Sequence, residues 1–340
     1  MKIIVVMPVR NEEWILEKTL KAISLFVDHI IVADQNSTDR TLEICRKFKK
    51  VIVIQNKNRF HISSVRKQLL DAARNFEGNN IILSFDADEI PTAHIIDNNF
   101  LNKLKKLPPG SSLLFQWINL WKSPLKYRQD NSIWANSWKP FGFVDDRKSD
   151  YNFLNVIDHA PRVPASTLTN IYKFDFPKVL HYNFVDYDRM LSKQAYYRFT
   201  EILQRKNTFL NFLKINLTYF STKDEYNIIL KDLPLNWIKF YVEKGIDLLN
   251  FPEEELYWYD VEILKWFEQY GASYFKWLDI WDIDWEEKRQ VVIERGTKDL
   301  PKDKIKDPRS FYIKFYHRYL QPLLSYNSFL YKIYRFLKKL

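Results

Sequence analysis

Four short runs of uninterrupted apolar residues near the N-terminus constrain the fold of this chain more than any other feature. They are Ile3–Val6, Ile30–Val32, Val51–Ile54 and Ile81–Leu83. Runs of this length without polar alternation are typical of strands that are buried on both faces of a parallel sheet. Apolar residues at helical spacing separate them, at 15–23 and 65–73. The alternation predicts an α/β fold in which helices cover a mostly parallel central sheet.

The pattern changes twice further along the chain. Short segments rich in Trp, Asn and Pro follow from about residue 107, with one further strand expected at Phe115–Ile118 and a loop-heavy stretch at 134–164. Helical periodicity returns after Tyr187 and continues through aromatic segments. We therefore expect one α/β domain over residues 1–205 and a helical, aromatic-rich C-terminal extension over residues 206–340.

Composition agrees with a folded chain of about two domains. Of the 340 residues, 46% are hydrophobic and 28% are charged, so a substantial core can form. The single cysteine, Cys45, excludes an intrachain disulfide and any multi-cysteine metal site. Lys2 is followed by only five apolar residues before Pro8, and no segment approaches the ~20 apolar residues of a membrane span. A cytoplasmic location is expected.

Glycine is scarce, and its placement excludes several nucleotide-binding motifs. The chain has six glycines, and the first is Gly78. Dinucleotide fingerprints and Walker A loops need glycines that let the backbone approach phosphate closely. None of these can occur in the first 77 residues. A nucleotide bound there must be held by side chains and a metal ion.

Polar, acid-bearing loops follow three of the predicted strands. They are Pro8–Glu12, Asp34–Asp39 and Asp86–Glu89. Because ligands bind beyond the carboxyl ends of the strands in an open parallel sheet, these loops are expected to converge on one rim. The convergence predicts a binding site more strongly than any one loop does.

Individual residues of this rim suggest roles. Asp86 and Asp88 leave the same face of an extended chain and suit Mg²⁺ or Mn²⁺, although an acidic turn is the alternative. Asp34 is placed to accept hydrogen bonds from a nucleobase or ribose, whereas Asp39 mainly caps the next helix. Arg66 either faces a diphosphate or is a solvated surface cation.

These loops resemble the family 2 glycosyltransferases. The residues that carry the resemblance are Pro8-Val9-Arg10-Asn11-Glu12-Glu13, then Val32 to Thr41, then Phe85-Asp86-Ala87-Asp88-Glu89. They follow the family's PxYNEE, DDGSTDGT and DADD or DADE motifs in order and spacing. The resemblance is specific over residues 2–95 and extends to about residue 205. It implies a GT-A type nucleotide-diphospho-sugar transferase fold, with a nucleotide-sugar half at 1–105 and an acceptor half at 106–205.

The resemblance also implies a set of site residues. The nucleotide-sugar donor would be bound by Pro8, Val9, Arg10, Asn11, Glu12, Asp34, Asn36, Arg66, Asp86 and Ala87. A Mn²⁺ or Mg²⁺ ion would be held by Asp86, Asp88 and His181. For His181 a structural role is the alternative. Arg10 replaces the usual aromatic residue and Gln35-Asn36 replaces Asp-Gly, which leaves uracil, guanine and thymine open as the base, with UDP expected.

An inverting transfer needs a general base that deprotonates the acceptor hydroxyl. By resemblance this is a carboxylate well downstream of the DxD motif. Asp158, next to His159, is the first candidate and Asp146 the second; Asp145 and Asp150 complete the set. Each can instead be a loop carboxylate with local hydrogen bonds.

The C-terminal tail is basic and aromatic. Residues 308–340 contain no acid and carry +7 of the net charge of +10. Apolar residues at 330, 333, 334 and 337 form a helical stripe. The pattern predicts contact with an anionic membrane surface, with a terminal helix docked on the extension as the alternative. No nucleic-acid module accompanies the charge, so nucleic acid is not an expected partner.

Together these features predict a metal-dependent inverting hexosyl- or N-acetylhexosaminyltransferase. It would move a sugar from a nucleotide-diphosphate donor to a hydroxyl of a glycan or lipid-linked acceptor, in cell-surface polysaccharide or lipopolysaccharide synthesis at the inner face of the membrane. Two alternatives remain at this stage. One is a glycan- or lipid-binding module without catalysis, and the other is a nucleotidyltransferase.

Overall fold

The computed structural model describes residues 1–56, 63–132, 134–151, 161–220, 228–252, 254–297 and 300–324. The chain forms two compact units. The first comprises residues 1–129, 133–185 and 230–252, and the second comprises 130–132, 186–229 and 253–340. The functional division at residue 205 stays a prediction.

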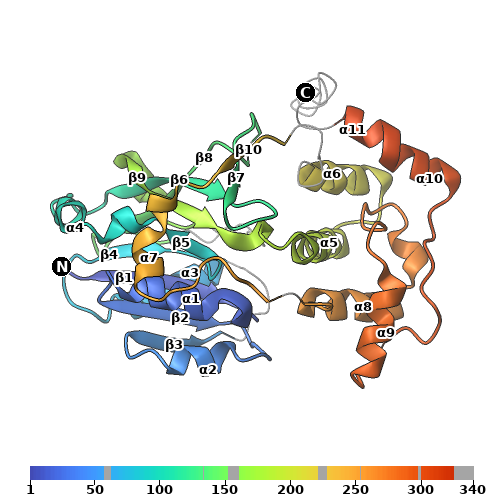
Figure 1. The fold of residues 1–340 in the computed structure, drawn as a ribbon, viewed down its shortest axis with the longest axis horizontal. Coiled ribbons are helices and arrows are strands. Elements are labelled where there is room, and N and C mark those ends of the chain that lie inside the picture. The colour runs from blue at the N-terminus through green and yellow to red at the C-terminus, as the bar shows by residue number, and fades with distance from the viewer. Residues whose placement is uncertain are drawn as a thin grey trace. The chain divides into compact units, whose positions relative to one another are not determined.

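A mixed sheet forms the centre of the first unit (Figure 1). Among the described residues it has eight strands in the order β3-β2-β1-β4-β8-β6-β9-β5. Their bounds are β1 Ile3–Val9, β2 His29–Asp34, β3 Val51–Gln55, β4 Ile81–Ser84, β5 Glu89–Pro91, β6 Ser112–Asn119, β8 Ser137–Val144 and β9 Ile171–His181. A small antiparallel pair joins β7 Lys126–Arg128 to β10 Leu230–Asp232.

The strand pairing changes from parallel to antiparallel between β4 and β8. Strands β3, β2, β1 and β4 are parallel to one another, and β6 is parallel to β9. Strand β8 pairs antiparallel with both β4 and β6, and β5 pairs antiparallel with β9. The predicted α/β class with a mostly parallel sheet is confirmed. Strand β8 corrects the expectation of a loop-heavy stretch at 134–164.

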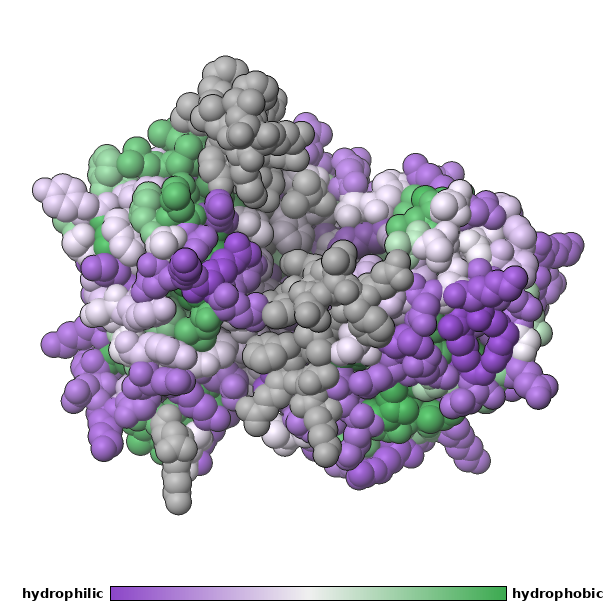
Figure 2. Space-filling model, turned by 180° about the vertical axis from the view of Figure 1, so that it is seen from behind, coloured by the Kyte–Doolittle hydropathy of each residue, from purple (hydrophilic) through white to green (hydrophobic). Residues whose placement is uncertain are grey.

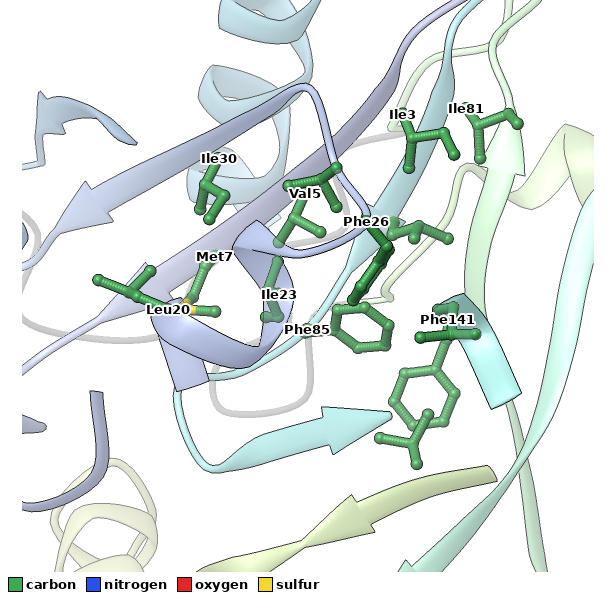
Figure 3. Packing of buried hydrophobic residues seen from close by; sticks show 14 of the residues in the cluster. Ile3, Val5, Met7, Leu20, Ile23, Phe26, Ile30, Ile81, Phe85 and Phe141 are labelled. Atoms are coloured by element: carbon green, nitrogen blue, oxygen red, sulfur yellow. The ribbon is translucent and has the colours of Figure 1, made fainter. Parts of the chain in front are cut away.

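Alternate residues of the parallel strands bury the two faces of the sheet. On one face, Val5, Ile30 and Leu83 belong to a core cluster with α1 (Glu13–Ser24) and α2 (Thr41–Arg46). The close-up in Figure 3 shows Val5 and Ile30 beside Leu20 and Ile23 of α1. Burial of each such side chain stabilises the folded state by about 1.5–3 kcal/mol.

The opposite face of the same strands is covered by α3 (Ser63–Ala73). Val6, Ile31 and Ile82 share a cluster with Leu69 and Ala73 of this helix. Because successive side chains of a strand point to opposite faces, two apolar faces require the continuous apolar runs seen in the sequence. Helix α4 (Asn98–Lys105) completes the helices of the N-terminal part.

Residues 230–252 return to the first unit. They include β10, a 3₁₀ helix at Leu235–Trp237 and α7 at Lys239–Glu243. The Tyr241 hydroxyl donates to the Pro91 carbonyl over 2.9 Å, and Trp237 is buried in a cluster with Ile118 and Leu180. This part of the expected C-terminal extension therefore belongs to the unit that contains the sheet.

The second unit is helical, as predicted for the C-terminal region. Its helices are α5 Tyr187–Leu203, α6 Phe209–Phe220, α8 Trp258–Tyr270, α9 Trp285–Glu294, α10 Phe311–Phe315 and α11 Gln321–Leu323, with a π-helical turn Tyr316–Leu320 between the last two. Phe199, Phe267 and Phe275 lie in its core. Within the described part of the chain, no helix combines the length and the apolar character that crossing a membrane requires.

Candidate functional site

The loops that follow β1 and β2 are tied together by hydrogen bonds. The Asn11 side chain accepts from the Thr38 backbone N–H at 2.7 Å, and the Asn11 N–H donates to the Ser37 hydroxyl at 3.0 Å. Asn11 and Asn36 have positive φ angles of 51° and 59°, a conformation that Asn tolerates better than most residues. The predicted convergence of these two loops is therefore present in the structure.

Asp34 lies at the end of β2 beneath these loops. Its side chain is 3% exposed, and both carboxylate oxygens lie 3.3 Å from the Ser37 N–H. Asp39, in contrast, accepts from the backbone N–H groups of Glu13 and Thr41. It thus holds the starts of α1 and α2.

The other residues of the first loop differ in their surroundings. Pro8 and Val9 are buried within β1, and the Val9 carbonyl accepts from the Gln35 N–H. Arg10 is half-buried, and the Glu12 carboxylate accepts from the Trp14 indole at 2.7 Å. Ala87 of the third loop is 2% exposed and belongs to the core.

Two arginines bind the Asp86 carboxylate, one at each oxygen. The buried Arg66 guanidinium donates to Asp86 Oδ1 at 3.1 Å and to the Ser84 hydroxyl at 2.8 Å. Arg162 donates to Asp86 Oδ2 at 2.7 Å. Arg66 is thus buried next to the DxD motif, and the solvated alternative does not describe it.

Glu89, the last residue of the DADE motif, is the centre of this charged cluster. Its fully buried carboxylate accepts from both terminal nitrogens of Arg162 at 2.7 Å, from the Trp117 indole at 2.8 Å and from the Asp86 N–H at 2.8 Å. Burial raises the pKa of Glu89, and the Arg162 guanidinium acts against that rise. Four N–H donors surround the carboxylate, which is the environment of an ionised group.

Asp88 faces His181 across the end of the sheet. In the strand register, Asn119 lies opposite His181, and His181 lies opposite Glu89. The His181 Nε2 atom is 3.4 Å from Asp88 Oδ2, and Trp117 stacks on the imidazole with ring centroids 4.4 Å apart. Asp88 is 3% exposed and His181 is 8% exposed.

The orientation of His181 follows from its neighbours. The Asn119 amide nitrogen donates to the Trp134 carbonyl at 2.6 Å, so the Asn119 carbonyl oxygen is the atom that faces His181 Nδ1 at 2.8 Å. Nδ1 therefore carries a proton, and in the neutral ring Nε2 presents a lone pair to the Asp88 carboxylate. Two acceptors this close require a proton or a cation between them.

This arrangement fits a divalent metal. A metal-bound histidine usually donates its other N–H to a carbonyl or carboxylate oxygen, as His181 does to Asn119. Imidazole and carboxylate are both ligands that Mn²⁺ accepts. Within the residues that the structure describes, Asp88 and His181 are not part of a group of three or more His, Cys, Asp or Glu side chains with metal-binding geometry.

Lys139 of β8 completes the cluster. Its ammonium lies 3.3 Å from the centre of the Trp117 ring. Burial, and then the nearby charge of Arg162, lower the pKa of Lys139 to about 8. The cluster therefore contains three bases, Arg66, Arg162 and Lys139, besides the three acids Asp86, Asp88 and Glu89.

The base candidates occupy different places. Asp158 lies outside the described residues. Asp150 forms an ion pair with Lys67, 3.2 Å apart. Asp145 is 2% exposed, accepts two hydrogen bonds from Arg74 and donates its own N–H to the Asn80 carbonyl.

Asp146 lies at the opposite end of β4 from Asp86. Val144, two residues before it, pairs with Ile81 at the start of β4, whereas Asp86 follows the strand's end at Ser84. At about 3.3 Å per residue, the strand alone separates them by roughly 13 Å. Burial raises the pKa of Asp146, but hydrogen bonds from Ser149 and Lys148 outweigh it and lower the pKa. Both observations speak against Asp146 as the base.

Glu89, Asn119, Lys139 and Arg162 belong to this site, and the sequence analysis did not select them. Glu89 was part of the quoted DADE motif, so a signal for it existed. Arg162 is 73 residues from Glu89, and Asn119 is 62 residues from His181. No local pattern connects residues at such separations.

Comparison with known families agrees with these motifs. Residues 4–160 match the family described as glycosyl transferase family 2. Comparison with curated proteins gave no match.

Among solved structures, S. aureus TarS is 16% identical with a TM-score of 0.38, covering 67% of this chain and 44% of that chain. The chain thus spans less than half of that relative. TarS 1-349 in complex with UDP-GlcNAc is 14% identical with a TM-score of 0.38, covering 87% of this chain and 93% of that chain. Glucosyl-3-phosphoglycerate synthase from Mycobacterium tuberculosis is 20% identical with a TM-score of 0.23, covering 35% and 44%.

The fold, with its acid-rich loops after β1, β2 and β4, and the family match point to one assignment. Residues 4–160 of this chain are a glycosyl transferase family 2 domain, and they lie in a unit with an α/β fold built on a mostly parallel central sheet.

Proposed function

We propose that this domain transfers a sugar from a nucleotide-diphosphate donor, with UDP as the nucleotide, to a hydroxyl group with inversion at the anomeric carbon. The observation that carries the proposal is the Asp88–His181 pair beside the charged cluster of Asp86 and Glu89. It stands on the same rim of the sheet as Asp34. This combination provides a place for a nucleoside and a place for a diphosphate.

Asp88 and His181 would hold Mn²⁺ or Mg²⁺, with Asp86 as a further ligand if one of its two arginine contacts is released. The bound ion would stabilise the negative charge of the departing diphosphate. We propose that the nucleoside is contacted by the side chains of Asp34, Arg10, Asn11, Glu12 and Asn36 and by the backbone of Pro8 and Val9.

The charges of the cluster match such a donor. Counted with charged carboxylates, which the arginine contacts favour, the three acids and three bases of the cluster cancel one another. A bound dication would give the cluster a net charge of +2, which balances the negative charge of a nucleoside diphosphate sugar. Since buried charges are stable only when compensated, donor and metal are expected to bind together.

The protein's own groups would position the reactants and move one proton. Arg162 and Arg66 fix the Asp86 carboxylate, and Asn119 fixes the His181 ring. The base would take the proton of the acceptor hydroxyl as that oxygen attacks the anomeric carbon from the side opposite the diphosphate. We propose Asp158 for this role, on the family resemblance alone.

The acceptor and location are further parts of the proposal. We propose a glycan or lipid-linked acceptor in cell-surface polysaccharide or lipopolysaccharide synthesis. The transferred sugar would be a hexose or an N-acetylhexosamine. The enzyme would work in the cytoplasm, peripherally at the inner face of the membrane, because residues 308–340 carry a charge of +7.

A panel of nucleotide sugars tests the reaction directly. The purified chain with Mn²⁺ is expected to release nucleoside diphosphate slowly from one donor, since water can replace the acceptor. Asp146→Asn, at the far end of β4, is the matched control and should hydrolyse the donor as the wild type does. Release of pyrophosphate from a nucleoside triphosphate with a sugar phosphate would instead identify a nucleotidyltransferase. Donor binding without product would identify a non-catalytic module.

A further inference from the structure

The helical segment Phe311–Leu323, formed by α10, the π-helical turn and α11, has one face fixed to the second unit. Ile313, His317 and Gln321, spaced four residues apart, are all buried. His317 Nε2 lies 3.2 Å from the Trp277 carbonyl, and the Gln321 side chain donates to Asp279 at 2.8 Å. The segment is therefore held in place by specific contacts along its inner face.

Its outer face exposes large apolar and aromatic side chains. Tyr312 is 80% exposed and Phe311 is 76% exposed. The other members of this outer face are Phe315, Tyr319, Leu320 and Leu323, with exposed fractions between 43% and 56%. Figure 2 shows hydrophobic residues gathered at its upper left, where α10 and α11 of Figure 1 lie after the half-turn. A contiguous apolar surface of this kind marks an interaction site.

The charge of the same segment is entirely positive. Lys314 and Arg318 lie between the exposed aromatics, and no acid occurs from 308 to the C-terminus. Asp307 forms ion pairs with Arg309 and Lys314 at the segment's start, which leaves Arg318 beside the Tyr319 ring. Four further bases follow in the sequence, at 332, 335, 338 and 339.

We propose that the outer face of Phe311–Leu323 docks on an anionic lipid surface. Aromatic rings and leucines supply apolar contact at the depth of the headgroups, and the bases are attracted to anionic lipids. A second copy of the same face would bring like charges together, so lipid is the favoured occupant. This inference rests on the membrane location proposed above and is independent of the reaction.

Sedimentation of the full chain with vesicles tests the face. One vesicle preparation contains phosphatidylcholine with a quarter phosphatidylglycerol, and the other contains phosphatidylcholine alone. We expect the wild type to sediment with the anionic vesicles. The variant Lys314→Gln/Arg318→Gln should bind them about 25-fold more weakly at low salt, at about fivefold per charge. The variant Phe311→Ser/Tyr312→Ser/Phe315→Ser should also bind at least tenfold more weakly, and its loss should persist at high salt.

Two control variants and two further readouts complete the design. Leu210→Ser in α6 and Lys239→Gln in α7 alter residues of similar exposure elsewhere and should bind as the wild type does. Thermal unfolding checks that each variant is folded, and donor hydrolysis should be unchanged in all of them.

If the wild type does not bind anionic vesicles, both the proposed membrane location and the proposed docking face are wrong. If the wild type binds and both face variants bind as well as the wild type does, the proposed membrane location is supported but the proposed docking face is wrong. Concentration-dependent dimers that the aromatic variant abolishes would also overturn the inference, because a second copy would then cover the face.

Discussion

At the scale of residues, His181 shows how neighbours determine the role of a side chain. Trp134 orients Asn119, Asn119 orients His181, and His181 presents Nε2 to Asp88. The first two steps each pair a donor with an acceptor, and the third brings the Nε2 lone pair to the Asp88 carboxylate. The chain of hydrogen bonds produces a site at which one cation can satisfy two facing acceptors.

Replacement of Asp88 tests this site. Asp88→Asn removes a negative charge and a metal-binding oxygen, so we expect donor hydrolysis to be nearly abolished. The thermal transition should stay close to that of the wild type. Product release with Mn²⁺, and again with EDTA, measures the effect. An active Asp88→Asn enzyme, or activity that survives EDTA, would contradict the metal assignment.

The general base gives a second residue-scale prediction. Asp158→Asn should lower turnover by about two to four orders of magnitude, the usual contribution of general acid–base catalysis. Donor affinity should hardly change, because the base acts on the acceptor. Steady-state kinetics with a competent acceptor separates the two quantities. Normal turnover in this variant would require another base.

Lys139 gives a prediction for the pH dependence of stability. Its pKa is lowered to about 8 by burial, whereas an unfolded lysine titrates near 10.4. Between these values the unfolded state binds more protons, so the free energy of unfolding should rise with pH from about 8 to 10. Below pH 8 the Lys139 ammonium is charged in the folded protein, so its desolvation lowers the free energy of unfolding to the full extent.

Lys139→Met should therefore raise the unfolding temperature at pH 7, and this gain should shrink as the pH approaches 10. Thermal unfolding at several pH values measures it. Lys239→Met, at a side chain that is 72% exposed, is the control and should show no such trend. A gain that stays constant with pH would show that the Lys139 charge is not the cause.

At the scale of elements, β8 is the strand that joins the two halves of the sheet. It runs antiparallel between β4 and β6, and its register with β6 shifts between Leu113 and Leu114. Gly142 lies opposite Leu83 of β4. A Cβ atom at this glycine would be 2.7 Å from the Ile82 carbonyl oxygen and 2.7 Å from a methyl group of Leu83.

Gly142→Ala should therefore destabilise the sheet. Because the Ile82 carbonyl belongs to the backbone of a central strand, β4 and β8 would have to separate locally, at a cost of about 1–3 kcal/mol. Urea unfolding followed by circular dichroism measures the change. Ser137→Ala, at the start of the same strand, should cost less than about 0.5 kcal/mol. Equal stability of the two variants would mean that β8 adjusts without strain.

At the scale of the whole molecule, the first unit is discontinuous in sequence. Residues 186–229 belong to the helical unit, and residues 230–252 return to pack with the sheet. Trp237 of the returning segment is 6% exposed and lies near Tyr127 and Phe176, with ring centroids 5.7 and 6.0 Å away. The sheet-containing unit is thus complete only when the chain extends past residue 250.

Trp237→Ala should show how much the returning segment contributes. Loss of a buried tryptophan is expected to lower the free energy of unfolding by about 3–5 kcal/mol. Leu235→Ser, two residues away and 64% exposed, should change it by less than about 0.5 kcal/mol. Denaturant unfolding compares the two variants. A small effect at Trp237 would mean that the first unit does not depend on this segment.

The sequence alone predicted the parallel part of the sheet and the loops that end its strands. Strands β1, β2 and β4 are buried on both faces, so each appears as an uninterrupted apolar run, which is a local signal. The edge strand β3 has the same apolar run although its side chains are half-buried or exposed. Parallel order then requires the loops of Asp34 and Asp86 to meet at one edge. Local patterns were sufficient because the burial of a strand is visible in its own residues, and the helices between the strands indicate their parallel direction.

Strands β8 and β9 needed the tertiary structure. Strand β8 contains Pro140 and Gly142, and β9 contains Pro177 with exposed residues over much of its length. The proline in each strand cannot donate to the ladder and weakens the local strand signal, and both strands are stabilised by pairing with distant segments.

The partners within the site were decided in the same way. Glu89 needs Arg162, His181 needs Asn119, and Lys139 needs Trp117, each from another part of the chain. Which acid faces a histidine and which is paired with arginine depends on distances of 3 to 4 Å between such residues. Those distances are set by packing of the sheet, because a side chain's electrostatic surroundings come from all the elements around it.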